Sequence, residues 1–136
     1  MRKFSIGAVL TAVCLVAALA FAGCASAPKG DAVTAGSADD PFAGTTWSSA
    51  AGAGLYGSIA MNISFADGKA SGNVIGKGSR AYSVVKTEAG TYAAVIKGIP
   101  FVTNSYSLET DAQDPKKGLL SVTAGFTTST ADMVKQ

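Results

Sequence analysis

Histidine is absent from this chain of 136 residues. Its absence removes the side chain most often used as a general base and as a metal ligand. Only two cysteines occur, Cys14 and Cys24, and Cys14 lies inside an apolar stretch, so we expect no structural disulfide and no cysteine–histidine metal cluster. The sequence therefore predicts no enzymatic activity, no metal site and no bound cofactor.

Charged residues are also few, at 15% of the chain. Two of the 11 basic residues are Arg2 and Lys3, so the rest of the chain holds nine basic and nine acidic residues. Proteins that bind nucleic acids usually carry a basic patch on the folded domain. A nucleic-acid partner is therefore not expected.

No segment after residue 41 shows the helical spacing of apolar residues over the length that a helix needs. Glycine is instead abundant, with 16 residues, and several segments alternate apolar with polar side chains. In "SIAMNISF", residues 58–65, Ile59, Met61, Ile63 and Phe65 occupy every second position. This alternation is typical of a strand with one buried face.

Seven or eight such strands are predicted in succession. We expect an all-β fold, an antiparallel meander closed or nearly closed into a small barrel, because closure removes exposed strand edges. A two-sheet sandwich is the alternative. In the last long segment, Leu120, Val122, Ala124 and Phe126 are expected on one face. The predicted strands are 42–49, 58–65, 70–76, 80–86, 91–98, 99–110, 119–129 and 131–136.

The first 23 residues have the pattern of a secretory signal peptide. Arg2 and Lys3 precede an uncharged apolar run from Phe4 to Ala22, which we expect to form a signal helix. A retained transmembrane helix is the alternative, because the run is close to the length of about 20 residues that crosses a bilayer. The polar segment that follows has no basic stop-transfer cluster, which favours a processed leader.

The end of the leader and the residue after it read Phe21-Ala22-Gly23-Cys24, which resembles the lipobox of bacterial lipoproteins. Phe21 replaces the usual leucine, as in the relaxed lipoboxes of spirochaetes. The resemblance implies that Cys24 carries a covalent diacylglycerol, with an acyl chain on its amine, and that a membrane is the partner. Ala25 fits an outer-membrane or cell-surface location in the envelope better than the inner membrane. Ordinary cleavage, which would leave Cys24 as a free thiol, is the alternative.

The segment after the cysteine contains mainly small and polar residues. Such a segment cannot bury enough apolar surface to fold by itself. We therefore predict three parts: the signal peptide at 1–23, the lipidated cysteine with a flexible tether at 24–41, and the β-barrel domain at 42–136.

The domain opens on Phe42-Ala43-Gly44-Thr45-Thr46-Trp47, and Phe65-Ala66-Asp67-Gly68 predicts a hairpin turn. This opening resembles that of lipocalin-like and avidin-like barrels, in which the tryptophan closes one end. The resemblance implies that a small apolar ligand could bind inside the barrel. Alternatively, the aromatic residues that would line such a cavity pack in the core. The domain would then be a protein-interaction or inhibitor module for an envelope or host protein. The candidate lining residues are Trp47, Tyr82, Tyr92 and Tyr106.

Two further motifs are interpreted as structural. The glycine-rich segment from Gly72 to Ser79 lacks the spacing of a phosphate-binding loop, so it predicts a hairpin or bulge. Asp111 and Asp114 stand in a turn beside proline and lysine, where carboxylates usually shape the loop.

Overall fold

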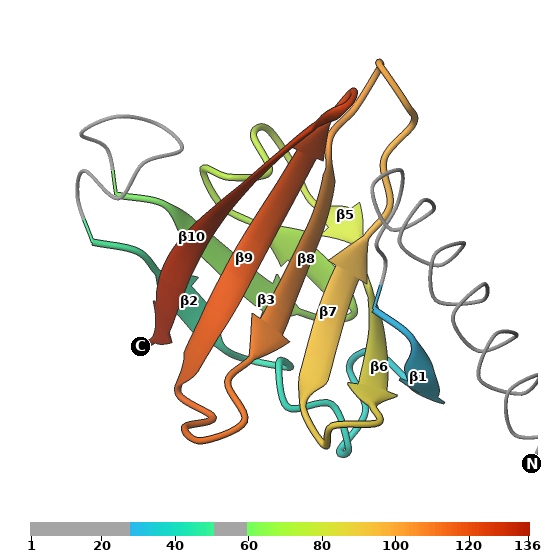
Figure 1. The fold of residues 1–136 in the computed structure, drawn as a ribbon, viewed down its shortest axis with the longest axis vertical. Coiled ribbons are helices and arrows are strands. Elements are labelled where there is room, and N and C mark those ends of the chain that lie inside the picture. Colours follow the sequence, from blue (N-terminus) through green and yellow to red (C-terminus); the bar gives the residue numbers. More distant parts are fainter. Residues whose placement is uncertain (1–27, 51–59) are drawn as a thin grey trace, which may run out of the picture.

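The computed structural model describes residues 28–50 and 60–136, and within these ranges the protein is all-β (Figure 1). None of these residues belongs to a helix long and apolar enough to cross a bilayer. The predicted signal helix, the lipobox residues Phe21, Ala22 and Gly23, and Cys24 lie outside the described residues. The ten strands are β1 (Gly30–Val33), β2 (Thr46–Ser48), β3 (Asn62–Ala66), β4 (Lys69–Ser71), β5 (Arg80–Ala81), β6 (Ser83–Thr87), β7 (Tyr92–Ile96), β8 (Ser105–Thr110), β9 (Lys117–Ala124) and β10 (Thr127–Lys135).

All ten strands form one antiparallel sheet in the order β1-β6-β7-β8-β9-β10-β2-β3-β4-β5. Strands β6 to β10 form a meander, β10 then pairs with β2, and β2 to β5 continue the sheet. The sheet curls into an open half-barrel (Figure 1). The predicted all-β antiparallel class is confirmed, but neither the closed barrel of seven or eight strands nor a two-sheet sandwich is found.

The segment predicted as one strand at 80–86 is divided in the structure. It is interrupted at Tyr82 into β5, which pairs with β4, and β6, which pairs with β7 on one side and β1 on the other. The backbone N–H of Tyr82 donates to the carbonyl of Gly68, 3.3 Å away. Within the described residues, no ladder joins β1 to β5 at the two ends of the sheet.

Strand β1 was predicted to be part of a flexible tether, and this prediction is wrong from residue 30 onward. The four residues of β1 pair with the edge of β6, and Asp40 is buried. A ladder is made by backbone groups, so the small side chains of β1 do not prevent it. A Cβ at Gly30 would lie 2.0 Å from the carbonyl oxygen of Lys86, so the close approach of the two strands requires glycine.

The segment predicted as one strand at 119–129 is also divided. The chain turns at Gly125, where φ is +62°, and returns as β10. Phe126 was expected on the buried face, but the turn leaves it 90% exposed. Glycine tolerates this left-handed backbone without steric cost, and in a strand it often marks a bend.

The inner face of the sheet is filled by side chains from every second strand position. In β3, Ile63 and Phe65 are buried while their neighbours face outward, as the alternation predicted. Phe65 lies between Phe42 and Tyr82, with ring centroids 5.2 Å and 4.8 Å away. The largest fully buried side chains are Trp47, Phe42, Phe65, Met61, Ile63, Ile96, Leu108, Leu120, Met133 and Val84.

Candidate functional site

Three of the four predicted ligand-lining residues are part of the packed core. Trp47 is 1% exposed, and its Nε1 donates to Thr45 Oγ1 at 2.9 Å. The hydroxyl of Tyr106 donates to the carbonyl of Val74 at 3.0 Å. Tyr82 donates its hydroxyl to the Asp40 carboxylate. Their polar side-chain atoms are therefore hydrogen-bonded within the protein.

The fourth residue, Tyr92, is half-buried at the start of β7. Its ring packs against the core, with Lys86 Nζ 5.8 Å from the ring centroid. The structure thus gives all four residues packing roles.

The buried carboxylate of Asp40 accepts three hydrogen bonds. The donors are the backbone N–H groups of Gly36 and Phe42, each at 2.8 Å, and the hydroxyl of Tyr82. Burial, and then the hydrogen bond and charge of Asp40, raise the pKa of Tyr82 above its usual range. A phenol that is harder to ionise is a poor general base near neutral pH. These hydrogen bonds are therefore suited to fixing the 34–45 segment against Tyr82.

Residues 28–50 and 60–136 contain no group of three or more metal-ligating side chains, and no buried side-chain polar atom among them lacks a hydrogen-bond partner. The Asp111 carboxylate accepts the backbone N–H groups of Gln113 and Asp114. This contact shapes the β8–β9 loop, as the sequence predicted.

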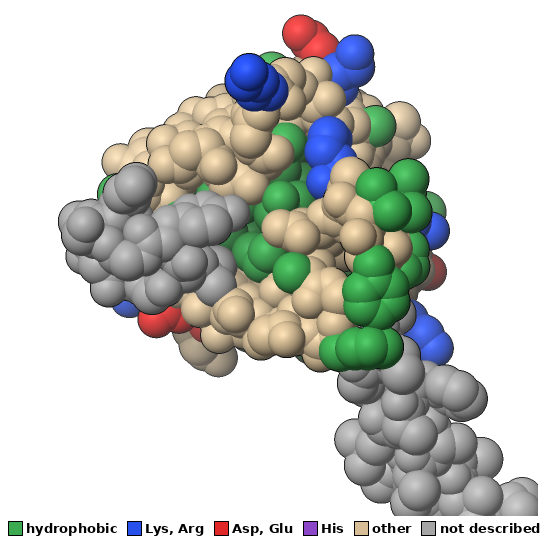
Figure 2. All heavy atoms as spheres, turned by 90° about the horizontal axis from the view of Figure 1, so that it is seen from above, with side chains coloured by type: hydrophobic (Ala, Val, Ile, Leu, Met, Phe, Trp, Pro, Cys, Tyr) green, Lys and Arg blue, Asp and Glu red, His purple; other side chains and the backbone are tan. Residues whose placement is uncertain are grey.

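The clearest surface feature is a cluster of exposed apolar residues, which we call the apolar tip: Ile99, Pro100, Phe101 and Val102 in the β7–β8 loop, and Phe126 in the β9–β10 turn. The exposed fractions of Phe101, Val102 and Phe126 are 69%, 73% and 90%. The rings of Phe101 and Phe126 meet edge to face, with centroids 4.9 Å apart. Figure 2 shows hydrophobic side chains gathered at one corner of the upper face.

The backbone of the β7–β8 loop holds this tip in a defined shape. The N–H of Val102 donates to the carbonyl of Ile99 at 2.9 Å, and Phe101 has a φ of +63°. A proline followed by a residue with positive φ is the arrangement of a type II turn, in which glycine usually takes the second central position. A left-handed non-glycine residue costs about 1–2 kcal/mol, so the turn keeps a bulky aromatic residue where glycine would be favoured.

Further hydrogen bonds hold the base of the tip, which is the part of the β7–β8 loop next to the strands. Thr103 donates its N–H to the carbonyl of Ile99 and accepts the N–H of Ile99 at its hydroxyl, at 2.9 Å and 2.8 Å. Arg80 donates to the carbonyls of Asn104 and Lys97 in the same loop. Its guanidinium carbon also lies 5.6 Å from the ring centroid of Tyr106.

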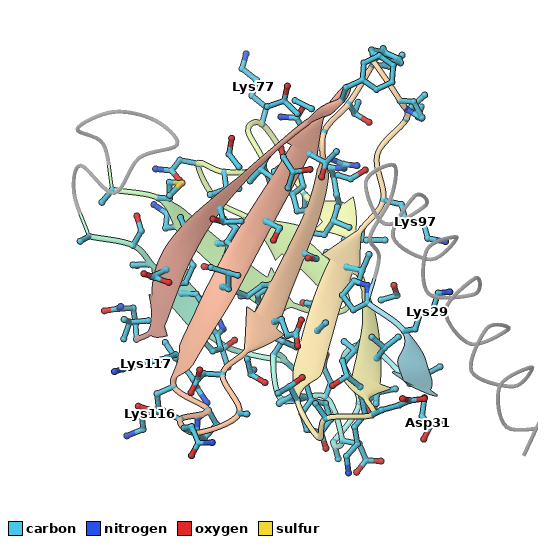
Figure 3. All side chains as sticks on the ribbon, viewed as in Figure 1. Lys29, Asp31, Lys77, Lys97, Lys116 and Lys117 are labelled. Atoms are coloured by element: carbon cyan, nitrogen blue, oxygen red, sulfur yellow. The ribbon has the colours of Figure 1, made fainter. Side chains whose placement is uncertain are left out.

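Charge is distributed unequally between the two ends of the fold. The upper end is defined by the β4–β5 and β7–β8 loops, the β9–β10 turn and the adjoining strand ends. It carries Lys77, Arg80 and Lys97, and none of the nine acidic residues of the chain. Figure 3 shows Lys77 at the upper end, Lys97 near mid-height, and Lys116, Lys117 and Asp31 at the lower end. The acidic residues are Asp31, Asp39, Asp40, Asp67, Glu88, Glu109, Asp111, Asp114 and Asp132.

Sequence reasoning missed the tip because it assigned 99–110 and 119–129 to continuous strands. Pro100 and Gly125 were the available signals, since both residues commonly interrupt strands. No protein-family model, curated protein or solved structure was found to match the chain.

Proposed function

We propose that the chain is a lipid-anchored protein of the cell envelope, in the outer membrane or at the cell surface, whose β domain acts without enzymatic activity by binding a partner at its surface. Lipid attachment to Cys24 is supported by the sequence alone, through the charged start, the apolar run and the lipobox-like Phe21–Cys24. Two or more acyl chains would hold the protein stably at a membrane.

The packed inner face is the observation that carries surface binding over ligand storage. Phe42, Trp47 and Phe65 are each at most 1% exposed. The hydroxyl groups of Tyr82 and Tyr106 are already bonded to protein atoms. A pocket for a small apolar ligand would need free volume and a few polar groups directed into it. The arrangement therefore favours the interaction module over the lipocalin-like carrier.

The anchor is tested by mass spectrometry of the mature N-terminus and by membrane fractionation. We expect a mature chain that begins at a lipid-modified Cys24, and Cys24→Ala should leave the membrane fraction or remain unprocessed. Cys14→Ala is the matched control, because it removes the other cysteine within the predicted leader and should fractionate like the parent chain. An unmodified mature chain that begins elsewhere would disprove the anchor.

Surface action is tested by titrating the chain, in detergent, with a fluorescent fatty acid. We expect no saturable binding at one equivalent. Stoichiometric binding that is abolished by enlarging an inward side chain, as in Ala94→Phe, would instead establish the ligand-carrier function. Ala94 is 1% exposed and lies on the inner face of β7.

A further inference from the structure

We propose that the partner of the apolar tip is the interfacial region of an anionic lipid bilayer. This inference deepens the proposed surface function by naming its partner, and it does not require the lipid on Cys24. It depends on four features of the tip: its apolar exposure, its backbone bonding, its size and the charges around it.

The tip exposes apolar groups where a monomeric domain would normally bury them. Ile99, Phe101, Val102 and Phe126 are all at least 60% exposed. In Figure 1 the β7–β8 loop is the uppermost part of the fold and extends beyond the ends of the strands. A contiguous exposed apolar patch usually marks a contact with protein or membrane.

Several backbone N–H groups of the β7–β8 loop are bonded within the protein. Pro100 has no N–H, and the N–H groups of Ile99, Val102 and Thr103 all donate within the loop. In lipid, polar backbone groups must find partners inside the protein because solvent cannot supply them. This internal bonding lowers the cost of placing the loop among acyl chains.

The size of the tip favours a bilayer over a protein partner. The tip comprises the five apolar residues defined above, whereas a stable protein–protein interface engages about 20–30 residues on each side. Contact with a bilayer interface needs only buried apolar area together with attraction to anionic headgroups.

The basic side chains at this end of the fold favour a bilayer with anionic headgroups. Lys97 is the first residue of the loop, Arg80 is bonded to its base, and Lys77 lies in the β4–β5 loop at the same end of the fold. Among the residues that the structure describes, the β4–β5 loop, the β7–β8 loop and the β9–β10 turn contain no acidic residue. Each basic side chain near an anionic membrane surface contributes about 1 kcal/mol, so the headgroups favoured by the tip carry negative charge.

The test uses the full-length chain with Phe126→Trp on vesicles of phosphatidylglycerol and phosphatidylcholine that contain a brominated lipid. The parent chain has one tryptophan, Trp47, which is 1% exposed and should not be quenched. We expect bromine to quench the introduced tryptophan. Leu119→Trp is the matched control, because Leu119 is 45% exposed on β9, opposite Asp132 and away from the tip. It should not be quenched.

Two further variants separate the apolar and ionic contributions. Phe101→Gly removes the ring and is compatible with the positive φ, so the loop should fold; in the Phe126→Trp chain it should reduce the ratio of lipid-inserted to free tip about tenfold. Lys77→Gln and Lys97→Gln should each reduce that ratio about fivefold on anionic vesicles. Neither lysine substitution should change it on vesicles of phosphatidylcholine alone.

Absence of bromine quenching at position 126, or equal quenching at positions 119 and 126, would overturn the inference. A second outcome would also overturn it: envelope extract protects the introduced tryptophan from quenching by aqueous acrylamide, but brominated lipid does not quench it. The partner of the tip would then be a protein. Flotation of the chain with vesicles reports the anchor separately. Flotation without tip quenching refutes the tip alone, whereas quenching in the Cys24→Ala chain supports the tip even where that anchor is lost.

Discussion

Removing the hydroxyl of Tyr82 tests how much its hydrogen bond to Asp40 stabilises the fold. Tyr82→Phe keeps the ring that packs on Phe65 and removes only the hydrogen bond to Asp40. The Asp40 carboxylate, 5% exposed, would retain its two bonds from backbone N–H groups. A hydrogen bond to a charged group contributes about 1.5–3 kcal/mol, so the free energy of unfolding should fall by that amount. For a domain of this size, each kcal/mol corresponds to roughly 4–8 °C in Tm.

Urea unfolding followed by Trp47 fluorescence measures this loss, with Tyr106→Phe as the control. Tyr106 donates to a neutral carbonyl, so its loss should cost about 0.5–1.5 kcal/mol. If Tyr82→Phe unfolds within 0.5 kcal/mol of the parent, the bond to Asp40 does not stabilise the segment, and the reasoning fails.

The same variant makes a prediction about alkaline pH. Because the folded protein raises the pKa of Tyr82, the tyrosine keeps its proton in the folded state at pH values where the unfolded chain has lost it. The contribution of Tyr82 to the free energy of unfolding is therefore fully present below the ordinary tyrosine pKa of about 10. Above that pH it falls by up to about 1.4 kcal/mol per pH unit. The stability difference between the parent and Tyr82→Phe should therefore narrow above pH 10. A constant difference would show that the pKa is not raised.

Three substitutions test the core, a close backbone contact and the surface by the same unfolding assay. Leu120→Ala truncates a side chain with 0% exposure and should cost about 2–5 kcal/mol; a smaller loss would mean that the inner face is loosely packed. Gly72→Ala should cost about 2 kcal/mol or more, because φ is +127° and a Cβ would lie 2.4 Å from the carbonyl oxygen of Asn62. Phe126→Ser should change stability by no more than about 0.5 kcal/mol; a large loss would assign Phe126 to folding instead of binding.

The strand pattern was predictable where alternation and turn chemistry agree. Asp67 and Gly68 adopt positive φ values of 54° and 75°, and the hairpin from β3 to β4 forms there as the sequence predicted. Alternation also placed Ile63 and Phe65 in the core. These features depend on neighbouring residues alone, so a single sequence contains them.

The errors arose where distant parts of the chain decide the outcome. Strand β1 exists because the edge of β6 is available to it, and its own small side chains gave no signal. The apolar tip was missed because an alternating pattern continued through Gly125 to Phe126, although the backbone reverses there. The buried role of Asp40 was not predicted either, since Tyr82, its partner, lies 42 positions away in the sequence.

The pairing of β1 with β6 also determines how a pulling force would reach the domain. With a lipid on Cys24, the six residues that lead to Gly30 can span at most about 20 Å, so the domain would stay close to the bilayer. Force applied through the anchor would load the four register pairs of β1 before it reached the core. Release of this strand would free the chain as far as Asp40, a section whose full extended length is about 35 Å. Strand β1 would then act as an extensible section of the anchor while the rest of the sheet remained folded.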